Sequence, residues 1–314
     1  MTYNVNEGTE FIPLSNPAAY GGLPGAVSAT WQQVQSSNIP ARTEALAKEI
    51  ARNHPAVVGL QEATVYTFAS PAGGRPTVTD SLALLLHDLK ALGEPYTAVV
   101  VSPTAKLPPL PDSGGNLITF TEENVIIVRA DLKGRLEVSN PQSGTFQAFV
   151  PFLGLHLTRS WASVDVTARG QTFRFIDTHL DSLSHVVQVA QAQELLAGPA
   201  KTMLPVVIAL DSNADAAHPK SDTYETYSTL IGAGFRDAWS QTHPIAPGLT
   251  WGPTAPPSPT LQLQQRLDLV LYRGGFKARG GHRVGSHLGE RTHTSPPLWP
   301  SDHLGVAVTL TLRA

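Results

Sequence analysis

Short apolar runs that stop abruptly at a polar residue recur along this chain, and they constrain its fold more than any other feature. Residues 205–210 read Pro-Val-Val-Ile-Ala-Leu, and Asp211 and Asn213 follow at once. A short, uncharged, β-branched run of this kind is typical of a buried strand. A carboxylate at the end of a core strand is costly to bury unless a cation or a hydrogen-bond donor meets it. The sequence therefore predicts a polar partner for Asp211.

Strand-like and helix-like segments alternate along most of the chain. Further strands are predicted at 55–62, 123–129, 161–168, 172–180, 266–272 and 304–312. Amphipathic spacing and capping residues predict helices at 38–53, 79–93 and 184–198. Two proline-rich stretches, 103–115 and 253–260, are expected to form surface loops. Many strands interleaved with helices favour a single α/β domain over residues 1–314, with two stacked sheets.

Composition excludes several classes of function. The chain has no cysteine, so it has no disulfide, thiolate metal site or cysteine nucleophile. A net charge of −3 without a run of Lys or Arg argues against nonspecific nucleic-acid binding as the main function. A nuclease stays open, because a metal ion supplies positive charge locally. No apolar run is long enough to span a membrane. The strand-like start at Met1, without a signal-peptide pattern, leads us to expect a trimmed upstream segment and a secreted or periplasmic protein.

Polar residues lie at the ends of several predicted strands, and neighbouring strands would bring them to one edge. Each has a structural alternative: a turn residue, a cap or a buried histidine. The combination favours a functional site built on a rigid scaffold. The residues are Asn4, Glu62, His179, Asp211 with Asn213, Asp268, and Asp302 with His303.

The chemistry that this set supports is narrow. The carboxylates and amides offer hard oxygen ligands, which suit Mg²⁺, with Mn²⁺ or Ca²⁺ as alternatives. His303 is a candidate general base, and Asp268 would hold its tautomer. His179 could contact a phosphoryl oxygen as charge builds there. Asp302 and His303 can both face the site only if residues 300–303 form a loop, which Pro300 and Ser301 favour.

Seven short motifs occur in an order that resembles the endonuclease/exonuclease/phosphatase superfamily. They are TYNVN, GLQE, ENVIIVR, DTHLD, LDSNAD, RLDLVL and SDH, and they run from Asn4 to His303. That superfamily includes deoxyribonuclease I, abasic-site endonucleases, inositol polyphosphate phosphatases and bacterial neutral sphingomyelinases. The resemblance implies a four-layered α/β sandwich of two mixed β-sheets flanked by helices, with a divalent metal at one end.

The resemblance also implies a role for each matched residue. Glu62 would be the chief metal ligand, Asn4 would support metal or phosphate, and Asp302 would assist the metal. Asp211 and Asn213 would orient and activate the attacking water, and Asp268 would pair with His303. Whether Asp211 or His303 takes the proton stays open, as does the number of metal ions.

Three positions bear on the subfamily. His179 resembles the histidine of the sphingomyelinase, deoxyribonuclease I and phosphatase branches, where abasic-site enzymes carry asparagine. Asn6 stands where those enzymes place an aspartate, so a strong second metal site is not expected. Both point away from DNA repair. Arg159 begins the segment RSWASVDV, which resembles the segment before the histidine strand of many exported bacterial members. It would reach substrate phosphate, although a surface arginine is the favoured interpretation.

The function expected is therefore a metal-dependent, sphingomyelinase-like phosphodiesterase that acts on a lipid headgroup or another non-repair phosphodiester. The alternatives are a secreted, deoxyribonuclease I-like nuclease and an inactive binding protein, which the complete polar set disfavours. We expect a monomer that contacts a membrane surface or nucleic acid only transiently. A lipid-directed enzyme should carry exposed apolar residues around its cleft, with Leu107, Leu110 and Leu261 of the proline-rich stretches as candidates. The tryptophans at 239, 251 and 299 lie close to the motifs and could line a pocket, but closure of the core edges is the favoured interpretation.

Overall fold

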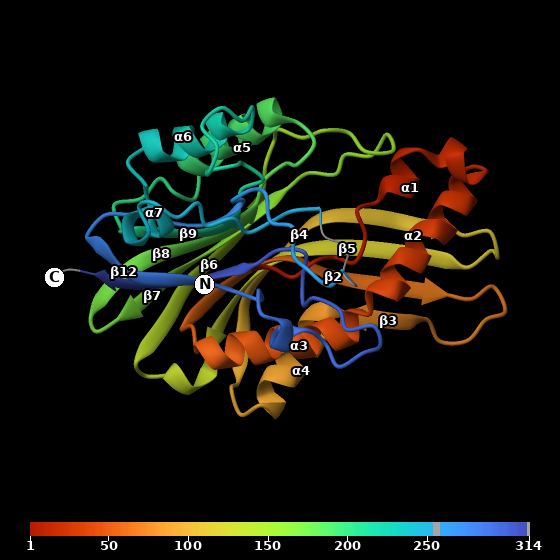
Figure 1. The fold of residues 1–314 in the computed structure, drawn as a ribbon, viewed down its shortest axis with the longest axis horizontal. Helices are drawn as coiled ribbons and strands as arrows, with labels where there is room; N and C mark the ends of the chain where they lie inside the picture. Colours follow the sequence, from red (N-terminus) through yellow and green to blue (C-terminus); the bar gives the residue numbers. More distant parts are fainter. Residues whose placement is uncertain (254–257, 313–314) are drawn as a thin grey trace.

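Two β-sheets packed face to face form the centre of the molecule (Figure 1), as seen in a computed structural model that describes residues 1–253 and 258–312. Both sheets are mixed: β1 pairs with β2 and β8 with β9 in parallel, and the other pairings are antiparallel. Among the described residues, sheet A has the order β12-β13-β1-β2-β5-β4, with β3 on β2, and sheet B has the order β10-β11-β9-β8-β7-β6. The strands are β1 (Thr2–Asn4), β2 (Val57–Ala69), β3 (Thr77–Asp80), β4 (Tyr96–Pro111), β5 (Leu117–Arg129), β6 (Leu136–Thr145), β7 (Ser160–Ala168), β8 (Gln171–His179), β9 (Val206–Asp211), β10 (Arg236–Asp237), β11 (Asp268–Arg273), β12 (Phe276–Val284) and β13 (Gly305–Leu312).

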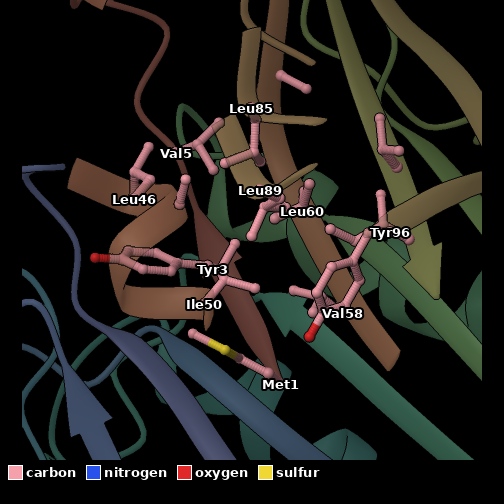
Figure 2. Close-up of a cluster of buried hydrophobic side chains, with 14 of the residues drawn as sticks. Met1, Tyr3, Val5, Leu46, Ile50, Val58, Leu60, Leu85, Leu89 and Tyr96 are labelled. Atoms are coloured by element: carbon pink, nitrogen blue, oxygen red, sulfur yellow. The ribbon is translucent and has the colours of Figure 1, made fainter. Parts of the chain in front are cut away.

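Helices cover the outer face of each sheet and complete four layers. Sheet A packs on α3 (Ile39–Asn53) and α4 (Ser81–Ala91) through a buried cluster that includes Tyr3, Leu46 and Leu89, as Figure 2 shows. Sheet B packs on α5 (His185–Ala197) and α6 (Tyr224–Gly232), and a third cluster fills the space between the sheets. The four-layered α/β sandwich implied by the sequence resemblance is confirmed. The remaining helices are α1 (Ile12–Ser15), α2 (Leu23–Ser37) and α7 (Ala238–Thr242), with short 3₁₀ turns at Pro17–Tyr20, Ala130–Leu132 and Leu288–Glu290.

The helices predicted from the sequence form where capping residues place them. Asn38 caps α3 by accepting a hydrogen bond from the amide of Ala41, and Asp80 caps α4. Ser184 caps α5 in the same way, and Gly198 follows its last turn. Across the part of the chain that the structure describes, no helix is both long and apolar enough to cross a membrane.

The first proline-rich stretch is not a surface loop, so that prediction is wrong. Residues 103–111 continue β4, which lies at the edge of sheet A and pairs with β5 through repeated register shifts. An edge strand tolerates proline, especially at bulges, because it needs fewer ladder hydrogen bonds. Leu107 is consequently buried, at 4% exposure, so the expectation that it is an exposed residue is wrong, although it lines the inner part of a cavity. The second stretch falls partly on residues 254–257, which lie outside the described residues.

Candidate active site

Strand register brings three of the expected site residues to one level of sheet B. His179 on β8 and Asp268 on β11 both lie directly opposite Asp211 on β9. In sheet A, Asn4 at the end of β1 lies opposite Gln61, the residue before Glu62. The adjacent ends of the two sheets share a cavity of about 410 Å³. Its polar lining includes Glu62, His179, Asp211, Asn213, Asp302 and His303.

Glu62 reaches this cavity because β2 bulges at its position. The register with β5 shifts between Leu60 and Ala63, and Glu62 has a left-handed backbone with φ of 59°. Bulges of this kind redirect a side chain and are common beside active sites. The Glu62 carboxylate accepts hydrogen bonds from Asn4 Nδ2 at 2.7 Å and from the Glu7 amide at 2.9 Å. Burial raises the pKa of Glu62.

Asp211 lies at the centre of the cluster, and its side-chain partners are two imidazoles and an amide. Its Oδ2 lies 2.9 Å from Asn4 Nδ2, 3.5 Å from His179 Nε2 and 3.7 Å from His303 Nε2. Its Oδ1 accepts the backbone amide of Asn213 at 3.0 Å. Burial acts to raise the pKa of Asp211, but His303, His179 and the Asn4 amide outweigh it and hold that pKa below its usual value. The polar partner predicted for Asp211 is therefore present.

His303 and Asp268 form the buried pair expected from the sequence. His303 Nδ1 lies 2.8 Å from Asp268 Oδ2. Burial opposes the charged imidazolium, but Asp268 and Asp211 raise the pKa of His303 well above its usual range. The backbone amide of His303 donates to Ser301 Oγ, which in turn donates to the Asn4 carbonyl. Residues 300–303 precede β13, as predicted, so both Asp302 and His303 reach the cavity.

His179 is held on both sides of its ring. Its Nδ1 lies 3.2 Å from Glu122 Oε1, and its Nε2 lies 2.8 Å from Asn213 Nδ2. Glu122 and Asn213 thus fix the orientation of the imidazole in the cavity.

Arg159 is not a surface residue, so the favoured interpretation of this arginine is wrong. Its side chain is 20% exposed, and its Nη1 lies 2.7 and 2.9 Å from the two Glu122 oxygens and 3.2 Å from His179 Nδ1. Burial acts to raise the pKa of Glu122, but Arg159 and His179 hold it below its usual value. Arg159 thus lines the cavity with its charge already paired.

Sequence reasoning missed Glu122 and the position of Trp251. Glu122 is an acid inside a buried strand, the same signal that drew attention to Asp268, but its polar neighbours Thr121 and Glu123 concealed it. Trp251 lines the cavity, with its ring 6.3 Å from that of His303, because an isolated bridge joins their backbones. The core-edge prediction is wrong for Trp251, whereas the tryptophans at 239 and 299 are buried at 8% and 2% exposure.

The donor set fits a divalent cation. Ligand atoms of Glu62, His179 and Asp211 lie within 4.8 Å of one another. Two further expected ligands are already engaged: Asn4 Oδ1 accepts the Asn6 amide at 2.9 Å, and Asp302 Oδ1 accepts from Asn6 Nδ2 at 2.6 Å. Asp302 still has a second oxygen, and it lines the cavity. Carboxylate oxygens with an imidazole suit Mg²⁺ or Mn²⁺ better than a thiophilic ion.

The chain is thus a two-sheet α/β sandwich with buried carboxylates, amides and imidazoles at one end. The family model described as "Endonuclease/Exonuclease/phosphatase family" matches residues 1–303, and the chain belongs to that family. Members of this family are hydrolases that act on phosphoester bonds. No curated protein matched the sequence.

Solved structures share the fold at low sequence identity. A mannosyl-6-phosphatase from Bacteroides thetaiotaomicron is 17% identical, with a TM-score of 0.61, and the match covers 99% of this chain and 98% of that one. An endonuclease/exonuclease/phosphatase from Beutenbergia cavernae is 24% identical, with a TM-score of 0.61 over 86% and 66% of the two chains. Humanized D. rerio TDP2 is 18% identical, with a TM-score of 0.58 over 99% and 97%. These likenesses show a common fold.

Proposed function

We propose that the protein is a divalent-metal-dependent phosphodiesterase that hydrolyses its substrate with an activated water molecule. The observation that carries the proposal is the position of Asp211, buried between two imidazoles and beside Glu62. Glu62 would hold the cation, with Asn4 and Asp302 in support; when bound, the cation would polarise the phosphoryl group and neutralise its charge. Mg²⁺ fits the oxygen-rich set, and Mn²⁺ or Ca²⁺ are alternatives.

The proton-transfer roles follow from opposite electrostatic surroundings. Asp211 remains ionised because its neighbours are cationic or donate hydrogen bonds, so it can accept a proton from water. His303 remains protonated because Asp268 and Asp211 stabilise its imidazolium, so its Nε2 can donate to a phosphoryl oxygen. We therefore assign the base to Asp211 and the donor to His303, with Asp268 fixing the imidazole.

His179, Asn213 and Arg159 would bind the phosphoryl group from the other side of Asp211. The Asn213 amide nitrogen lies 2.8 Å from His179 Nε2, so both groups can turn towards one oxygen. Arg159 lies against His179 Nδ1 and adds positive charge to this side.

The charge of the cavity favours a lipid headgroup or another non-repair phosphodiester over nucleic acid. Nucleic-acid binding needs several Lys or Arg contacts to successive phosphates. Among the described residues that line the cavity, Arg159 is the only Arg or Lys. The fold does not choose the substrate, since it is shared by a mannosyl-6-phosphatase and by TDP2. The acidic lining residues are Glu7, Glu10, Glu62, Glu122, Asp181, Asp211 and Asp302.

A metal-supplemented assay with bis-nitrophenyl phosphate tests this proposal. Glu62→Gln should lower kcat/KM by about 10²–10³, because it removes a charged ligand whose loss costs several kcal/mol of transition-state stabilisation. Glu44→Gln is the matched control, since Glu44 is exposed on α3 and pairs only with Lys48. Undiminished turnover after metal has been stripped with EDTA would refute the metal role. Absence of turnover on plasmid DNA, RNA, phospholipids and the nitrophenyl ester would favour the inactive binding protein.

A further inference from the structure

One part of the cavity is lined by apolar side chains that take no part in the polar cluster. We call it the apolar wall and define it by Phe11, Leu107, Phe120, Phe152, Leu157 and Leu183. These residues come from the start of α1, from β4 and β5, from the connection between β6 and β7, and from the segment before α5. The wall therefore lies in the same cavity as His179, Asp211 and His303.

The wall is packed and is not an accidental exposure of core residues. Phe120 and Leu107 form a buried part of it, each at 4% exposure. The ring of Phe11 meets that of Phe120 edge-on at 4.9 Å and that of Phe152 at 6.4 Å. Phe11 adopts a left-handed backbone with φ of 51°, which is unfavourable for a bulky side chain. Such strain persists where packing fixes the residue, and it clusters at ligand sites.

The connection that carries Phe152 and Leu157, residues 146–159, is tied to the scaffold. The amides of Gln147 and Ala148 donate to the Glu194 carboxylate on α5 at 2.7 and 2.9 Å. Phe152 and Leu155 pair through two backbone hydrogen bonds. Figure 1 shows this segment, in yellow-green, reaching from sheet B towards α1. The backbone of this connection is thus anchored before any ligand arrives, and Phe152 and Leu157 pack against a core cluster, which reduces the entropy cost of binding.

The charged residues that line the cavity also favour an apolar group beside the phosphate. The one arginine that lines the cavity, among the described residues, is already paired with Glu122, and the apolar wall adds no cation. A second phosphate beside the reacting one would therefore find no unpaired arginine or lysine among the described lining residues. Apolar surface continues outwards instead, because Leu183 and Val186 at the start of α5 are 67% and 65% exposed.

We infer that the apolar wall binds the apolar alcohol group of a phosphoester, an alkyl, acyl-bearing or aryl group, while the phosphoryl group lies between His179 and His303. This inference rests on the proposed function. In the reaction, the water oxygen bonds to phosphorus and one phosphorus–oxygen ester bond breaks. The proton that Asp211 takes from the water ends on the oxygen of the released alcohol. The group on the wall sets which ester reacts.

A series of nitrophenyl phosphodiesters with methyl, butyl and octyl groups tests the inference below their micelle concentrations. Burial of each methylene favours binding, so kcat/KM should rise about threefold per carbon over the first few. Phe152→Ala should lower the octyl-to-methyl ratio at least tenfold, and Phe152→Leu should restore much of it. Ile245→Ala, at a position that is 98% exposed and outside the cavity lining, should leave the ratio unchanged. A ratio near one in the parent protein would overturn the inference.

Two further measurements distinguish a failure of the apolar-wall inference from a failure of the proposed function. Calorimetry can compare the binding of octyl phosphate and methyl phosphate without any turnover. Tighter binding of octyl phosphate that is lost in Phe152→Ala supports the apolar wall, even if every ester resists hydrolysis. Equal binding of the two phosphates refutes the inference. Loss of all turnover would refute only the proposed function. Headgroup release from phosphatidylcholine vesicles, together with the chain-length effect, would identify the source as a lipid in a bilayer. A chain-length effect without headgroup release would identify a soluble ester. Both results support binding of an apolar group at the apolar wall.

Discussion

Two buried carboxylates on neighbouring strands have pKa values that are shifted in opposite directions. Asp211 and Asp268 lie opposite each other, yet the pKa of Asp211 is lowered and that of Asp268 is raised. Both experience strong burial. Two imidazoles and the Asn4 amide lower the pKa of Asp211. Burial raises the pKa of Asp268, and the nearby charge of Asp211 adds to this effect, while His303 opposes it. The three groups Asp211, His303 and Asp268 therefore behave as one titrating unit.

Asp268 and His303 should fail together when either is changed. Asp268→Asn removes the carboxylate that holds the imidazole, and His303→Gln removes the imidazole itself. Each should lower kcat by about 10²–10⁴, and the double variant should lose little more, as expected for residues that act as a unit. Asp131→Asn is the control, since Asp131 is exposed and pairs with Arg129. Multiplicative losses in single-turnover kinetics would show that the pair is not coupled.

At the scale of elements, helix α3 organises the site through one buried cation. Arg42 is 1% exposed and donates to the carbonyls of Val5, Asn6, Ser37 and Pro300 at 2.8–3.2 Å. Burial lowers the pKa of Arg42 to about 10, which leaves it charged at neutral pH. It thus joins α3 to the two loops that carry Asn6 and Asp302.

Removal of the Arg42 guanidinium should destabilise the fold. Arg42→Met leaves several buried carbonyls without a donor and should lower the free energy of unfolding by about 2–5 kcal/mol. Arg42→Lys should lose less, because it retains the charge and up to three donors. Lys48→Met, on the exposed side of α3, should cost less than about 1 kcal/mol, because its partner Glu44 is itself exposed. Urea titrations of the four proteins give these values, and equal losses in the Met variants would contradict the argument.

Local signals predicted the elements better than they predicted the contacts between them. Asn38, Asp80 and Ser184 start their helices as expected, because a cap depends only on residues a few positions away. Strand ends located the polar cluster, since a buried run that stops at an acid is visible in the sequence. The positions of Glu122 and Trp251 depend on which strands become neighbours, and no local pattern contains that information.

At the scale of the whole molecule, the stability of the folded state should depend on a bound metal ion, because potential ligands are clustered at the site. Ligand atoms of Glu62, His179 and Asp211 converge within 4.8 Å, so a cation bound only by the folded state should stabilise it. At 100 times its dissociation constant, the ion adds about 2.7 kcal/mol. Thermal unfolding at pH 7 should therefore shift upwards with Mg²⁺ or Mn²⁺ in the parent protein and in Glu44→Gln, but little in Glu62→Gln. An equal shift in all three would mean that the ions bind elsewhere.

The register of sheet B has a consequence for how this protein can diversify. His179, Asp211 and Asp268 sit at strand ends, whereas Phe152 and Leu157 belong to a connection anchored at Glu194. On the proposed function, the residues assigned to the reaction and those assigned to substrate preference thereby lie in separate stretches of the sequence. Exchange of residues 149–157 for a segment of different length or polarity should then alter which esters are accepted, while the proposed catalytic residues stay in place. Laboratory evolution of new substrate ranges should therefore collect its first mutations in that stretch and spare the strands.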